Sequence, residues 1–90
     1  MINTGFNTDI VSNGKTYHVQ TEDWGEENPF VVTRVYQSGA VVLSVKTSYK
    51  DVINKTFATG RQAISLGMRE QHQKVLDQLV SGTLFSASLR

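Results

Sequence analysis

The chain has 90 residues, no cysteine and a formal net charge of +1 at pH 7. This length predicts one domain with a small core, and the lack of cysteine excludes disulfides and thiolate metal sites. The basic residues are spread singly along the chain, so we expect no nucleic-acid partner. No apolar run approaches the ~20 residues needed to cross a membrane, and the N-terminus lacks a secretory-signal pattern. We therefore expect a cytoplasmic protein without membrane insertion.

The first half of the chain is predicted to form a β-meander. Apolar-rich and alternating patterns indicate strands over residues 6–12, 15–22, 30–37 and 41–48. Asn13-Gly14 is a strong hairpin signal, because both central positions of such a turn need φ > 0, and Ser38-Gly39 predicts a second tight turn. Residues 23–29 form an acidic loop that contains Trp24.

The second half is predicted to contain one long helix. Apolar residues recur with a 3.6-residue period between residues 61 and 81. Thr59 and Gln62 fit a capping box at its start, and Gly82 suits its end. Gly67 inside the helix indicates a close backbone approach, or simply tolerance of glycine. The fold class is therefore α+β: a four-stranded antiparallel meander with one helix on one face, ββββα.

The domain is expected to span residues 1–82, followed by a short tail over residues 83–90. Residues 49–58 are predicted to be a crossover from the last strand to the helix. Its apolar side chains are expected to be half-buried; they are Tyr49, Val52, Ile53 and Phe57.

His72 falls inside the apolar arc of the predicted helix. A buried imidazole needs partners for its ring nitrogens, because an unpaired buried polar group costs about 1–3 kcal/mol. We expect those partners on the sheet, in a structural polar cluster that includes His18 and His72. The alternative is a small-ligand or metal-binding domain that uses both histidines with Glu22 and Asp23 as further ligands.

Two features predict a protein-binding surface. Strand 30–37 is apolar on both faces, although one helix can cover only one face of the sheet, which indicates self-association into a homodimer or a protein partner. Trp24 lies in a polar loop, and tryptophan is enriched at binding hot spots. Folding of this side chain back over the sheet edge is the competing interpretation. The partner-binding candidates are Gln20, Glu22, Asp23, Trp24 and Tyr36.

For Thr21 and Asp23, capping of the turn after the strand is the simpler interpretation. No nucleophile elbow, phosphate-binding glycine loop or metal-binding spacing is present in the sequence. We therefore expect a protein that is not an enzyme and has no catalytic residue, metal or cofactor.

Several segments together resemble the RomX-like family, small proteins and N-terminal domains of predatory and gliding bacteria. They are residues 5–9 (GFNTD), 17–23 (YHVQTED), 47–49 (TSY) and 71–74 (QHQK), with Gly25 and Pro29. Trp24 departs from the family, in which we expect a small or polar residue.

The resemblance implies a cell-polarity adaptor that is recruited to a cell pole and acts in bacterial motility. Such a protein binds a Ras-like small GTPase of the MglA type together with a response-regulator-like scaffold of the RomR type. Its implied role is to promote guanine nucleotide exchange on the GTPase.

Overall fold

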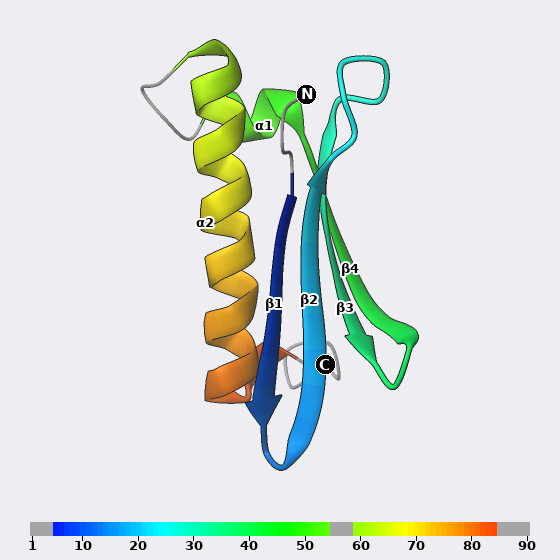
Figure 1. The fold of residues 1–90 in the computed structure, drawn as a ribbon. Helices are drawn as coiled ribbons and strands as arrows, with labels where there is room; N and C mark the ends of the chain where they lie inside the picture. The colour runs from blue at the N-terminus through cyan, green and yellow to red at the C-terminus, as the bar shows by residue number, and fades with distance from the viewer. Residues whose placement is uncertain (1–4, 55–58, 85–90) are drawn as a thin grey trace.

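The computed structural model describes residues 5–54 and 59–84 (Figure 1). Four strands form one antiparallel sheet in chain order: β1 (Gly5–Ser12), β2 (Lys15–Asp23), β3 (Phe30–Gln37) and β4 (Ala40–Ser48). Two helices follow: α1 (Tyr49–Ile53) and α2 (Gly60–Ser81). The long helix packs on one face of the sheet, so the predicted α+β class and meander are confirmed.

Both predicted hairpin turns are formed. Asn13 and Gly14 have φ of 54° and 76°, and Ser38 and Gly39 have φ of 53° and 82°. Two consecutive positive φ values match the right-handed twist of the flanking strands. These turns set the β1–β2 and β3–β4 registers, which close on the pairs Ser12–Lys15 and Gln37–Ala40.

The helix α2 contacts β1, β2 and β3, and it buries their helix-facing side chains in two apolar clusters. One cluster lies near the C-terminal end of α2 and consists of Tyr17, Val19, Val35, Val75, Leu79 and Leu84. The other lies near its N-terminal half and consists of Val31, Val52, Ile64 and Met68. Leu84 lies beyond the predicted domain boundary at residue 82, yet it belongs to the first of these two clusters.

The predicted crossover contains a short helix that the sequence analysis missed. In α1 the Ser48 Oγ accepts a 3.2 Å hydrogen bond from the Asp51 backbone N–H. Five residues are too few to show helical periodicity, which explains the omission. Val52 is fully buried and Ile53 is exposed, so the expectation of uniform half-burial is wrong; Phe57 lies outside the described residues.

The ends of α2 only partly follow the sequence signals. Thr59 is the N-cap with extended backbone, but within the described residues its side chain makes no capping hydrogen bond. The predicted capping box is therefore wrong. Gly82 ends the helix in the left-handed conformation at φ 79°, as predicted, and its N–H reaches the carbonyls of Gln78 and Leu79. Residues 85–90 of the predicted tail lie outside the described part.

Candidate functional site

His72 is buried between α2 and the sheet, with both ring nitrogens bound to threonines. Its Nε2 lies 2.9 Å from the Thr8 hydroxyl on β1, and its Nδ1 lies 2.8 Å from the Thr21 hydroxyl on β2. The Phe6 ring packs beside the imidazole, with centroids 5.8 Å apart. The predicted structural histidine with partners on the sheet is thus present.

The hydrogen bonds of His72 continue across the whole sheet. The Thr21 and Thr33 hydroxyls are 2.7 Å apart, and the Gln71 side chain donates to Thr33 at 3.0 Å. Thr47 on β4 donates to the Gln71 Oε1 at 2.6 Å. Each strand therefore contributes one threonine to a polar layer completed by Gln71 and His72. We call these six residues the threonine layer; Thr21, Thr33 and His72 are buried, and the other three are partly buried.

The donors and acceptors of the threonine layer follow one direction. Gln71 Nε2 also reaches the carbonyls of Val31 and Val45, which can only accept, so this nitrogen is the donor to Thr33. The Thr21 oxygen is the only acceptor for the Thr33 proton among the described residues, so Thr33 donates to Thr21, and Thr21 donates to His72 Nδ1. The imidazole is therefore neutral and carries its proton on Nε2, where it donates to Thr8.

Burial lowers the pKa of His72 below its ordinary value of 6.5, and the charge of His18 lowers it further. The hydrogen bonds of His72 also favour its neutral form. A protonated Nδ1 would face the Thr21 proton, so the hydroxyls of Thr21 and Thr33 would have to reverse. Thr33 would then have a buried proton without an acceptor among the described residues, which is costly.

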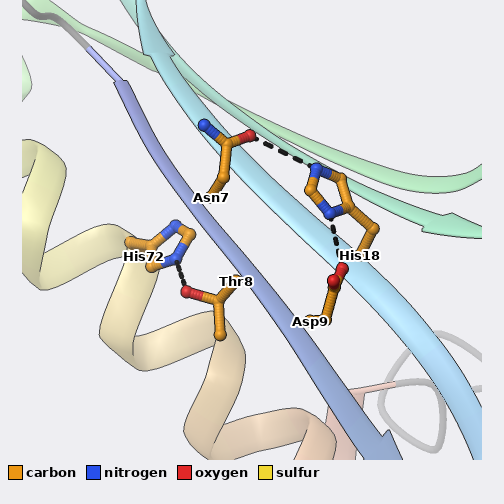
Figure 2. A network of polar contacts seen from close by, with 5 residues as sticks. All are labelled: Asn7, Thr8, Asp9, His18 and His72. Carbon is orange, nitrogen blue, oxygen red and sulfur yellow. Dashed lines mark hydrogen bonds and ion pairs between the residues drawn. The ribbon is translucent and has the colours of Figure 1, made fainter.

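His18 lies on the opposite face of the sheet from His72. Its Nδ1 is 2.8 Å from Asp9 Oδ1, and its Nε2 is 3.3 Å from Asn7 Oδ1 (Figure 2). In Figure 2, strand β1 runs between this group and the His72–Thr8 pair. The prediction of one polar cluster containing both histidines is wrong, because side chains alternate between faces along β1 and β2.

The separation of the histidines also removes the geometric basis of the predicted alternative, a ligand or metal site shared by both. Within residues 5–54 and 59–84, no three His, Asp or Glu side chains are grouped so that they could hold a metal ion. The carboxylates of Glu22 and Asp23, which that alternative needed as further ligands, are bound elsewhere as described below.

Most of the predicted partner-binding residues share the face of the sheet that α2 leaves uncovered. Cross-strand pairing places Glu22, Val32 and Lys46 in one row, Gln20, Arg34 and Ser44 in the next, and His18, Tyr36 and Val41 in the third. The Tyr36 ring packs against His18, with centroids 5.9 Å apart. A shallow hollow of about 790 Å³ is lined by residues including Asp9, His18, Gln20 and Tyr36.

Trp24 folds back over this uncovered face. Its Nε1 donates to Glu22 at 3.2 Å, and its ring lies 5.3 Å from the Lys46 Nζ and 5.6 Å from the Arg34 Cζ. Glu22 and Lys46 are the cross-strand neighbours of Val32 on either side, so the indole bridges over Val32. Val32, between these two side chains, is only 4% exposed, while Trp24 itself remains 37% exposed.

The burial of Val32 changes what the apolar pattern of β3 indicates about self-association. Val32 is buried within a single chain, so it needs no second copy to shield it from water. The strand pattern therefore gives weaker support to a homodimer than the sequence alone suggested, and self-association stays a prediction.

Asp23 does not belong to the uncovered face. Its side chain is 2% exposed and accepts hydrogen bonds from the Gly25 backbone N–H at 2.9 Å and from the Tyr49 hydroxyl. Its second oxygen pairs with Arg61 of α2 at 3.1 Å. The carboxylate joins the β2–β3 loop, α1 and α2, which fits the turn-capping interpretation and removes it from the partner-binding candidates.

Several residues of the threonine layer and of the uncovered face were missed in the sequence analysis. Alternation along the strands places Arg34 and Lys46 on the face of Tyr36, a signal that could have identified them. The threonines carried no comparable signal, because their role depends on strand register. The missed residues are Thr8, Thr33, Arg34, Lys46, Thr47 and Gln71.

Comparison with protein-family models, curated proteins and solved structures found no match for this chain. Among the described residues, no helix is long and apolar enough to cross a membrane.

Proposed function

We propose that this protein is a non-enzymatic adaptor that binds a protein partner through the uncovered face of its sheet. The observation that carries the proposal is the set of side chains on that face. Tyr36 and Trp24 are partly exposed there, beside Arg34, and these three residue types are the ones enriched at binding hot spots. The polar side chains Gln20 and Glu22 surround them, as in the rim of an interface.

The opposite face supports the same division of roles. There the threonine layer satisfies its own hydrogen bonds, and every buried side-chain nitrogen or oxygen among the described residues has a partner. A polar network whose buried atoms all have partners stabilises a unique packing of helix on sheet. Recognition of a partner is therefore assigned to the uncovered face.

The family resemblance suggests the partner. By resemblance it is a Ras-like GTPase of the MglA type, bound together with a response-regulator-like scaffold of the RomR type at a cell pole. The adaptor would promote nucleotide exchange by binding the nucleotide-loosened conformation of the GTPase more tightly than the nucleotide-bound one. This mechanism needs differential binding and no covalent step.

The test is nucleotide release from a purified GTPase of this type, loaded with fluorescent GDP, with and without the scaffold. The proposal expects release to accelerate and to saturate with the concentration of this protein. Tyr36→Ala should weaken binding to the GTPase by about 1–3 kcal/mol, so that a higher concentration of the variant is needed for the same acceleration. The matched control is Val80→Ala, which removes a similarly apolar side chain that is 65% exposed on α2.

Two outcomes would contradict the proposal in different ways. If release is unchanged with and without scaffold, the GTPase is not the partner. If release accelerates but Val80→Ala impairs it and Tyr36→Ala does not, the partner binds the helix side of the molecule, and the assignment of the uncovered face is wrong.

A further inference from the structure

Two positively charged side chains of the uncovered face share one aromatic ring. Lys46 and Arg34 both lie within 6 Å of the centre of the Trp24 ring, at 5.3 and 5.6 Å, and Lys46 lies 4.2 Å from the Phe30 ring as well. Neither forms an ion pair with a carboxylate in the described part of the chain. Trp24, Phe30, Arg34 and Lys46 are called the cationic platform below.

Packing of the indole does not require both cations. One cation–π contact contributes about 0.5–1 kcal/mol at an exposed site, and the hydrogen bond to Glu22 orients the ring further. Arg34 pairs with Ser44, two residues before Lys46, so the two cations are diagonal neighbours on one face. Like charges so placed repel each other, which is a cost that a bound anion would relieve.

Glu22 is a carboxylate of the same face that lies diagonal to Arg34, as Lys46 does, but within the described residues it forms no ion pair with either cation. Glu22 accepts from Trp24 on one oxygen and from Gln20 on the other, and it lies on the β2 side of the indole. Asp9 is bound to His18 on β1. The two cations on β3 and β4 therefore exceed this one neighbouring carboxylate by one positive charge, beside a partly exposed aromatic surface.

We propose that the cationic platform is a docking site for an acidic segment of a protein partner. A carboxylate of that segment would bridge Arg34 and Lys46, since a guanidinium pairs with a carboxylate in a fixed planar geometry. An adjoining apolar side chain would lie on the Trp24 ring. The inference rests on the proposed adaptor function and specifies the chemistry of the partner surface.

The same observations disfavour a nucleic-acid strand as the occupant. A strand brings a phosphate charge with every nucleotide and is bound through many basic contacts. Here only two unpaired cations are available, and the carboxylates of Glu22 and Asp9 lie on the same face. A short acidic segment matches that limited and local charge.

The experiment is an NMR titration of the isotope-labelled full chain with a short capped peptide of glutamates and leucines. The control peptide has glutamine in place of each glutamate, and a thymidine oligonucleotide of equal length is titrated in parallel. The reporters are the Trp24 indole N–H and the side-chain N–H of Arg34. The acidic peptide should shift both signals saturably, with affinity that falls as salt rises, while the glutamine peptide should not.

Charge-removing variants localise the binding. Arg34→Gln and Lys46→Gln should each weaken binding about tenfold, while Lys50→Gln and Lys74→Gln, exposed lysines on α1 and α2, should leave it unchanged. Lys46→Arg should retain binding, and thermal melting shows whether each variant folds. Equal losses in the Lys50 and Lys74 variants would overturn the proposal. Saturation of the same signals by the oligonucleotide at lower concentration than the peptide would do so too.

The result separates this inference from the adaptor function. If nucleotide release from the GTPase depends on Tyr36 but the acidic peptide leaves the Trp24 signal unmoved, only the acidic-segment proposal fails. If the peptide binds the platform and the GTPase does not respond to the protein, the proposed GTPase partner fails instead.

Discussion

Val52 of α1 occupies the space that a Cβ atom on Gly67 of α2 would need. An ideal Cβ built at Gly67 would overlap the Val52 Cγ1, and Val52 is 3% exposed in the apolar cluster with Ile64 and Met68. The glycine in the middle of α2 is therefore explained by a close approach of the two helices. The sequence analysis offered this interpretation beside simple tolerance of glycine.

Gly67→Ala is expected to destabilise the protein by about 1–3 kcal/mol, because overpacking outweighs the roughly 1 kcal/mol that alanine adds to helix propensity. Urea unfolding measures the change. In a Val52→Ala background, where the overlapping methyl is absent, the same substitution should be neutral or stabilising. Equal destabilisation in both backgrounds would mean that contact with Val52 is not the cause.

His72→Ala should destabilise the protein by about 2–4 kcal/mol, because it removes buried packing and leaves the Thr8 and Thr21 hydroxyls without their partner. His18→Ala is the matched control, since His18 lies on the uncovered face and its side chain is 41% exposed. Its effect on the free energy of unfolding should be below about 1 kcal/mol. Similar losses for both histidines would contradict the distinct roles assigned to them.

The stability of the protein should fall as the pH drops below 6.5. The folded state holds the pKa of His72 below this ordinary value, so the unfolded chain binds the proton more readily. The stabilising contribution is thus complete above the unfolded pKa and is lost as the pH falls toward the folded pKa. Urea unfolding between about pH 7.5 and about pH 5 measures it, and His72→Gln should flatten the slope in that window. An NMR titration in which His72 protonates above pH 6.5 would refute the sign.

Asp23→Ala is expected to cost about 2–4 kcal/mol in stability, because the buried carboxylate joins the β2–β3 loop, Tyr49 and Arg61. Tyr49→Phe, which removes one of these bonds and keeps the ring, should cost less, about 1 kcal/mol. Chemical denaturation of both variants is the measurement. A fully stable Asp23→Ala protein with impaired partner binding would return Asp23 to the partner-binding residues.

Trp24→Ala should expose Val32 and reduce stability by about 1–2 kcal/mol, less than a core tryptophan, since the side chain is already 37% exposed. Trp24→Phe should recover part of the loss by keeping an aromatic cover. Trp24 is also the only tryptophan, so partner binding at the uncovered face should shift its fluorescence. Complete unfolding of Trp24→Ala would place the residue in the core and move the binding surface elsewhere.

Local patterns in the sequence were enough for the four strands, the long helix and their order. The Asn13-Gly14 turn and the period of the segment around His72 depend on neighbouring residues only, and both predictions are confirmed. The position of His72 in the apolar arc also predicted its burial, since a helix with one covered face buries that arc. The five-residue helix at Val52 was missed because five residues make little more than one helical turn, which is too short to show a repeating pattern.

Only the tertiary structure decided which residues each of these side chains contacts. Strand alternation places His18 and Thr21 on different faces, but it does not say which face α2 covers. That choice depends on the summed burial of residues far apart in the chain, and it joins His72 to Thr21 while leaving His18 outside. The contact of Trp24 with Lys46 and those of Asp23 with Tyr49 and Arg61 are likewise long-range contacts. They separate the threonine layer from the surface that we propose for partner binding.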